Sequence, residues 1–275
     1  TPAPETRAPW RRVQGEAPLE IASTLMLITR TMKLSRLIAC ALAAAALLAG
    51  PALAQTYELK DCEQDDRASL SLRACTALLQ GSELNAGVRA RIYARRGLAW
   101  LIEDEPGEAL TDFTSAIKLN AQDLRALTGR ARAYTHLEQH AKAAGDWSAV
   151  IALDPQAEAN YLKRGASHLA AHNANAAMAD FDRSIALNPK SIDGFIGRAK
   201  VFAALKDKDK ALAEFARAEA IDPKHFAPYL ARAEAAEIWG DTKLAIENYG
   251  KALKVKTTVW TARKALKRLG IDTPP

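Results

Sequence analysis

From residue 90 to the end of the chain, the pattern of apolar and polar residues repeats every 34 residues. Within each period, apolar residues recur at spacings of three and four, which predicts two amphipathic helices. The second predicted helix carries an Ala followed four positions later by an aromatic residue, as in Ala109/Phe113, Ala143/Trp147, Ala177/Phe181, Ala211/Phe215 and Ala245/Tyr249. The pattern therefore predicts five copies of one helical hairpin.

Two further features of each period support the helical hairpin. A bulky residue on the first predicted helix is followed four positions later by Gly or Ala, which allows the second helix to approach closely. Pro155, Pro189 and Pro223 follow the second predicted helices of the middle periods, where proline prevents a helix from continuing. The same residues thus predict both the packing of each hairpin and the point where it ends.

A 34-residue period of this kind resembles the tetratricopeptide repeat (TPR). The resemblance implies an all-α fold, a right-handed α-solenoid superhelix of five helix-turn-helix units, with a concave surface that binds other proteins. We expect the repeats to occupy 90–257. Capping segments would lie at 55–89, with a helix from Arg67 to Gln80, and at 258–275, with a helix from Thr258 to Leu269. The approximate units are 90–123, 124–157, 158–191, 192–225 and 226–259.

The N-terminal pattern predicts export. A basic stretch from Met32, an apolar run and Ala52-Leu53-Ala54 are typical of a signal peptide spanning 32–54 and cleaved after Ala54. Residues 1–31 are then an upstream non-native or disordered leader. A retained membrane anchor is less favoured, because the apolar run is short and contains Gly50-Pro51. Lipidation at Cys40 is also less favoured, because the apolar run continues beyond that residue. The segment that contains Cys62 and Cys75, followed by such repeats, also resembles exported bacterial TPR proteins, which implies a periplasmic or secreted location.

Cys62 and Cys75 are the cysteines that remain after removal of the signal peptide. An even number of cysteines in an exported chain predicts one disulfide. Two separate buried thiols are the alternative. Neither cysteine has a histidine or a further cysteine near it in sequence, so we predict no zinc site there.

Charge and motifs limit the function classes. The net charge is +6, and the first 54 residues contribute six basic and three acidic residues, so the mature chain is only mildly basic. This balance does not favour nucleic-acid binding. No phosphate loop, nucleophile elbow or zinc-protease motif occurs, and we predict no enzyme and no cofactor. Two histidine pairs have metal-binding spacing, His136/His140 and His168/His172, but no patterned acids accompany them, and no metal is predicted.

An arginine recurs once per repeat on the first helix, and an acidic residue recurs on the second helix. One interpretation is an anion-binding row, and the favoured one is an ion pair within each repeat. Asn248 replaces the acid in the fifth repeat, which leaves Arg232 as the arginine expected to be most available to a ligand. The arginines are Arg96, Arg130, Arg164, Arg198 and Arg232, and the acids are Asp112, Asp146, Asp180 and Glu214.

The resemblance places partner binding on the first helices, which line the inner surface of the family's superhelix. Leu162, Ile196 and Leu230 occupy one position of three successive repeats and predict an exposed apolar strip, unless residues 55–66 or the last helix cover it. The predicted partner-binding residues are Leu98, Leu101, Arg125, Arg132, Leu162, Leu169, Ile196, Lys200, Leu230 and Glu234.

The sequence therefore predicts an exported, non-enzymatic scaffold that binds a protein or peptide in a concave groove. The alternative is an assembly factor that associates with the envelope or a membrane surface through its basic C-terminal helix. The partner, the pathway and the oligomeric state are left open. The basic residues near the C-terminus are Lys251, Lys254, Lys256, Arg263, Lys264, Lys267 and Arg268.

Overall fold

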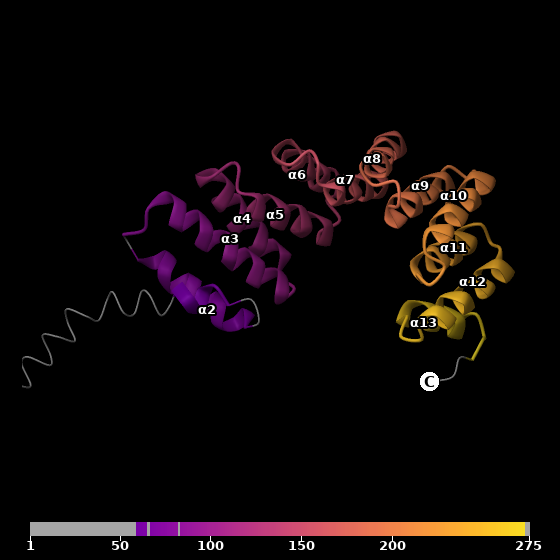
Figure 1. The fold of residues 1–275 in the computed structure, drawn as a ribbon. Helices are drawn as coiled ribbons and strands as arrows, with labels where there is room; N and C mark the ends of the chain where they lie inside the picture. The colour runs from indigo at the N-terminus through magenta and orange to yellow at the C-terminus, as the bar shows by residue number, and fades with distance from the viewer. Residues whose placement is uncertain (1–58, 65–66, 82, 273–275) are drawn as a thin grey trace, which may run out of the picture. The chain divides into compact units, whose positions relative to one another are not determined.

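The computed structural model describes residues 59–64, 67–81 and 83–272 (Figure 1). The chain divides into two compact units, Thr1–Tyr57 and Glu58–Pro275, and every described residue belongs to the second. The predicted leader at 1–31, the signal peptide at 32–54 and the cleavage site after Ala54 lie outside the described residues. None of the described helices is long and apolar enough to cross a membrane.

Every regular element among the described residues is an α-helix, which confirms the predicted all-α fold. Five helical hairpins follow one another, α3/α4, α5/α6, α7/α8, α9/α10 and α11/α12, and each helix packs against its neighbours in sequence. The helices are α2 (Ala68–Gln80), α3 (Ala86–Ile102), α4 (Pro106–Leu119), α5 (Leu124–His136), α6 (His140–Leu153), α7 (Glu158–Ala170), α8 (Ala174–Leu187), α9 (Ile192–Ala204), α10 (Lys208–Ile221), α11 (Ala227–Ile238), α12 (Thr242–Val255) and α13 (Trp260–Arg268).

The helix ends have local causes. At the start of α5, the Asp123 side chain accepts a hydrogen bond from the backbone N–H of Ala126, and Ser191 does the same for Gly194 at the start of α9. The helices α6, α8 and α10 end two residues before the prolines, as predicted. One residue in each hairpin turn adopts a left-handed conformation, with φ of 60° at Asp104, 56° at Glu138, 59° at His172, 63° at Lys206 and 73° at Gly240.

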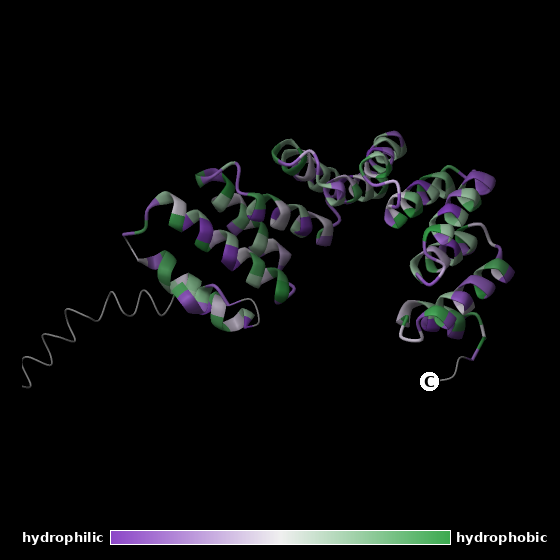
Figure 2. Cartoon of the chain, in the orientation of Figure 1, coloured by the Kyte–Doolittle hydropathy of each residue, from purple (hydrophilic) through white to green (hydrophobic). Residues whose placement is uncertain are grey.

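Buried alanines make up much of the core, and every hairpin buries at least one aromatic ring. Figure 2 shows that hydrophobic and hydrophilic residues share each helix, as expected for amphipathic packing. Phe113 is fully buried, and its ring lies where a Cβ atom on Gly97 or Gly129 would stand. Phe181 lies in the same way against Gly165 and Gly197. These two rings therefore pack into gaps on two successive first helices, which joins neighbouring repeats.

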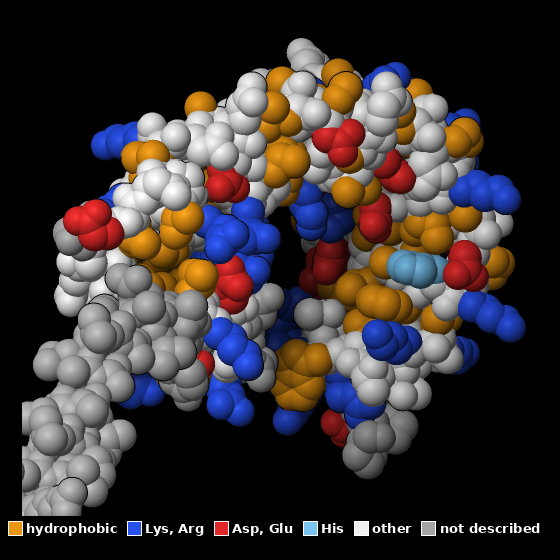
Figure 3. Space-filling model, turned by 60° about the vertical axis from the view of Figure 1, so that its left-hand side comes forward, with side chains coloured by type: hydrophobic (Ala, Val, Ile, Leu, Met, Phe, Trp, Pro, Cys, Tyr) orange, Lys and Arg blue, Asp and Glu red, His pale blue; other side chains and the backbone are white. Residues whose placement is uncertain are grey.

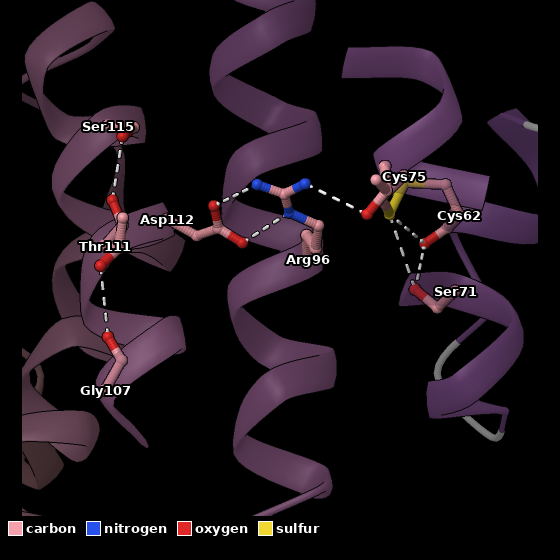
Figure 4. Close-up of polar contacts among 9 residues, drawn as sticks. Cys62, Ser71, Cys75, Arg96, Gly107, Thr111, Asp112 and Ser115 are labelled. Atoms are coloured by element: carbon pink, nitrogen blue, oxygen red, sulfur yellow. Dashed lines mark hydrogen bonds and ion pairs between the residues drawn. A yellow bond between two sulfur atoms is a disulfide. The ribbon is translucent and has the colours of Figure 1, made fainter. Parts of the chain in front are cut away.

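Both ends of the stack are closed as predicted. A disulfide joins Cys62 to Cys75 on α2, so the alternative of two separate thiols is wrong. The hydroxyl of Ser71 donates a 2.9 Å hydrogen bond to the carbonyl oxygen of Cys62, which adds a second link to this segment (Figure 4). At the other end, Ala262 and Leu266 of α13 are buried in the core of the last hairpin.

Candidate functional site

The arginine row forms ion pairs within the repeats. Arg96 donates two hydrogen bonds of 2.7 Å to the carboxylate of buried Asp112 (Figure 4). The same pairing joins Arg130 to Asp146, Arg164 to Asp180 and Arg198 to Glu214, with closest N–O distances of 2.7, 2.6 and 2.6 Å. The hydrogen bond to its aspartate raises the pKa of each of Arg96, Arg130 and Arg164. The row is therefore structural, as favoured from the sequence, and these guanidinium groups are not an anion-binding row.

Three of these arginines also link one repeat to the preceding one. Arg96 donates to the Thr76 hydroxyl on α2 at 3.1 Å, and Arg164 donates to the Ser148 hydroxyl on α6 at 3.2 Å. Arg198 reaches the Asp182 carboxylate on α8 at 2.9 Å. Each guanidinium group thus holds three helices together, since it has donors in several directions.

The expectation that Arg232 is available to a ligand is wrong. Its guanidinium group donates to Glu219 on α10 at 2.8 Å, and its side chain is 13% exposed. Asn248 is fully buried and donates its amide to the Leu244 carbonyl oxygen. A carboxylate from the preceding repeat thus takes the place of the acid that is missing from the fifth repeat. The spacing of residues within one repeat does not reveal such a contact between repeats.

Two adjoining cavities open along the middle first helices. The first has a volume of about 340 Å³ and lies between α5, α6 and α7. The second, of about 650 Å³, lies between α7 and α9, above the ring of Phe181. Lys163, Ala166 and Ala170 of α7 line both cavities. We call the two cavities together the α7 groove.

Five of the predicted partner-binding residues line the α7 groove. Arg132 lines the first cavity, and Leu162, Leu169, Ile196 and Lys200 line the second. The other five lie on first helices but outside both cavities: Leu98 and Leu101 on α3, Arg125 on α5, and Leu230 and Glu234 on α11.

The structure corrects the expected exposed strip at its centre. Ile196 is only 8% exposed and packs in the core of α9, α10 and α11. Leu162 is half-buried, so the two residues do not present equal surfaces although they occupy one repeat position. Ile196 is buried because it packs in one core with Ala231 and Ala235 of α11, whereas Leu162 is only partly buried against the cluster of Phe181. A charge at Ile196 would therefore disrupt the fold, and exposed alanines are better probes of the groove.

Sequence reasoning missed several lining residues. Trp147, His136, His140 and Ser167 line the first cavity. Ala166 and Ala170 were missed because an exposed alanine on a repeat helix carries no signal of its own.

The two histidine pairs lie in different surroundings. His136 and His140 both line the first cavity, where His136 Nδ1 lies 3.9 Å from Asp104 Oδ1. His168 Nε2 instead lies 3.9 Å from the Asp180 carboxylate inside its own repeat. Within the described ranges, no three His, Cys, Asp or Glu residues are grouped so that they could hold a metal ion.

Basic residues dominate the first helices of the N-terminal half of the stack. Helix α3 contains Arg89, Arg91, Arg95 and Arg96, α5 contains Arg125, Arg130 and Arg132, and α7 contains Lys163 and Arg164. The carboxylate of Glu158 is the one acidic side chain in these three helices. Figure 3 shows basic and acidic side chains bordering a hollow, with hydrophobic side chains between them.

Comparisons with solved structures agree on the fold. A TPR protein from Parabacteroides merdae is similar over 78% of this chain and 98% of its own, with a TM-score of 0.62 and 17% identity. TTC0263, a thermophilic TPR protein from Thermus thermophilus, gives a TM-score of 0.53 at 23% identity, covering 65% of this chain and 97% of its own. For MamA the TM-score is 0.51 at 19% identity, covering 69% of this chain and all of MamA. The chain matches no protein-family model and no curated protein sequence. The chain thus has the TPR fold, at identities where structural likeness establishes fold alone.

Proposed function

We propose that this chain is an exported scaffold that binds a partner protein or peptide in the α7 groove. The observation that carries the proposal is the second cavity, which combines the apolar Leu162, Leu169 and Phe181 with three charged side chains, Lys163, Asp193 and Lys200. An apolar cavity with a few charged groups around it is typical of a binding site, because apolar burial supplies affinity and the charges supply orientation.

The described parts of the capping segments pack away from this groove, which supports the proposal over self-occlusion. Leu59 and Cys62 pack with α2 and the start of α3 instead. Helix α13 packs against α12. Neither described segment contributes a residue to the lining of the two cavities.

A photo-crosslinking experiment in the native host tests the proposal. A photoreactive amino acid at Ala170, which is exposed and lines both cavities, should give a crosslinked partner band. The matched control is Ala213, an exposed alanine on the second helix α10 that lines neither cavity. The same band from both positions, or from Ala213 alone, would show that the partner binds elsewhere. Recovery of the crosslinked protein from the periplasmic fraction would test export.

The second candidate function is association with an anionic envelope surface through α13. The observation that favours it is Trp260, which is 70% exposed beside the exposed Lys264 on the same helix. An exposed aromatic residue among cations suits a membrane interface. Two members of the basic cluster are already paired, Arg268 with Glu237 and Lys251 with Glu247.

Co-sedimentation with vesicles containing phosphatidylglycerol tests this candidate. Substitution is better than deletion of α13, because deletion would expose the core that Leu266 covers. The double variant Trp260→Ser/Lys264→Glu should lose vesicle binding while its melting temperature stays the same. Vesicle binding that is equal in this variant and the unaltered chain would exclude α13 as the membrane contact.

A further inference from the structure

We infer that the partner of the α7 groove is an acidic segment, in which Asp or Glu side chains occupy the first cavity and a neighbouring aliphatic side chain occupies the second. This inference rests on the proposed function of the groove. Some positive charges on the first helices are neutralised by carboxylates of the protein itself, and the remaining positive charges are available to a ligand.

Two cations at the first cavity have no carboxylate partner. Arg130 and Arg164 are neutralised by Asp146 and Asp180 within their repeats. In contrast, the exposed Arg132 and Lys163 form no ion pair with any residue that the structure describes. Their positive charges lie on facing first helices, α5 and α7, and both line the same cavity.

The remaining polar groups of the first cavity are imidazoles and hydroxyls. No carboxylate of the described residues lines it, and the Asp104 carboxylate, which is 88% exposed, lies 3.9 Å from His136. The buried Nδ1 atom of His140 has no hydrogen-bond partner among the described residues. The hydroxyls of Thr135 and Ser167 already donate to backbone carbonyl oxygens, each at 2.9 Å. The groups left to meet a ligand are therefore cationic or imidazole groups, which suit a carboxylate.

The second cavity determines which type of residue is expected next to the acidic residue of the ligand. Leu162, Leu169 and Phe181 give it an apolar lining, and the carboxylate of Asp193, which also lines it, disfavours an acidic side chain there. Because α7 borders both cavities, one extended segment lying across it reaches both. Adjacent residues of an extended segment are about 3.3 Å apart. We therefore expect the acidic and aliphatic residues to be within a few positions of each other.

The positive character does not continue to the other end of the stack. Lys200 on α9 is 3.4 Å from Glu234 on α11, so its charge is partly neutralised. Glu237 on α11 accepts hydrogen bonds from Tyr249 and Arg268. The acidic part of the ligand is thus expected over α5 and α7 and not over α11, which gives the bound segment a defined direction.

Selection from a phage-displayed library of random dodecapeptides on the full chain tests the inference. The selected peptides should contain Asp and Glu above their share of the starting library, next to Leu, Ile or Val. The charge-reversed variant Arg132→Glu/Lys163→Glu should lose this acidic preference. It should also bind the peptides selected on the unaltered chain about tenfold more weakly, since opposite charges become like charges. Both substituted residues are exposed, so the fold should be retained, and a melting curve checks this.

The matched control is Lys118→Glu/Lys224→Glu, which changes the net charge equally at exposed positions outside both cavities. The control should keep the acidic preference. Enriched peptides without an acidic excess would overturn the inference while leaving the groove as a binding site. If the control loses the preference as the groove variant does, the selectivity comes from net charge and the inference is also wrong. Absence of any enriched peptide would count against the inference and the proposed function together.

Discussion

The packing of Phe113 between two glycines makes a quantitative prediction for Gly129→Ala. A Cβ atom at Gly129 would lie 2.3 Å from Cζ and 2.4 Å from Cε1 of the Phe113 ring. The ring has no room to retreat, because a Cβ atom built on Gly97 would also lie within 2.8 Å of it. The added methyl group must therefore displace α5 or force the ring off its rotamer.

The expected magnitude follows from two opposing effects. Overpacking of a close-packed core costs typically about 1–3 kcal/mol, and the tight contacts here favour the upper end. Replacing Gly by Ala inside a helix returns about 1 kcal/mol through helix propensity. We therefore expect Gly129→Ala to lower the free energy of unfolding by about 2 kcal/mol.

Gly145→Ala provides the matched control. Gly145 lies inside α6 and is exposed, and a Cβ atom added there would have nothing within 4 Å. This substitution should raise stability by about 0.5–1 kcal/mol. Urea unfolding followed by circular dichroism measures both variants, and the Gly129→Ala curve should move to lower urea and the Gly145→Ala curve to higher urea. If Gly129→Ala were as stable as Gly145→Ala, the Phe113 ring would not be the tight joint between the two repeats.

Three further predictions concern stability. Reduction of the Cys62–Cys75 disulfide, which closes a loop with a sequence separation of 13, should cost roughly 3 kcal/mol, and melting curves that coincide with and without reductant would contradict this. Lys206→Gly should raise the free energy of unfolding by up to about 1 kcal/mol, because Lys206 has a φ of 63° that glycine adopts without strain. The melting temperature should therefore rise, and a lower melting temperature would refute this prediction. The pKa of Asp241 is lowered by its hydrogen bonds with Lys208 and with the Leu244 backbone N–H, so its contribution to stability is complete above about pH 4 and is lost as the pH falls through the lowered pKa. Asp241→Asn, which can still cap α12, should unfold with a weaker dependence on acid pH, and an unchanged acid profile would argue against the Lys208 contact.

Much of the fold could be predicted because the residues that determine the packing recur in every repeat. The alanine and aromatic positions fix the two helices and their packing, and the prolines fix where α6, α8 and α10 end. The pairing of Arg96 with Asp112 was also predictable, since both partners recur with the same period. The left-handed turn residue was not predicted, because four different residues occupy it before Gly240.

The candidate site was only partly predictable, because it depends on how successive repeats approach one another. Leu162 and Ile196 occupy one repeat position, yet Ile196 is buried where α9 packs closely on its neighbours. Arg232 finds its partner Glu219 in the preceding repeat, which periodicity within a repeat cannot show. Lys163 and Ala166 became candidates only when the structure placed them between two cavities.

Binding of the partner in the α7 groove is best tested by an affinity measurement on a matched alanine pair. Ala166 is exposed and lines both cavities, and Ala179 is an exposed alanine on the second helix α8 that lines neither. Isothermal titration calorimetry would use the tightest peptide selected on the unaltered chain. Ala166→Trp should fill the groove and weaken binding at least about tenfold, a loss of about 1.4 kcal/mol or more, whereas Ala179→Trp should leave the affinity unchanged. Equal affinity for all three proteins, or an equal loss in both variants, would show that the peptide does not bind in the α7 groove.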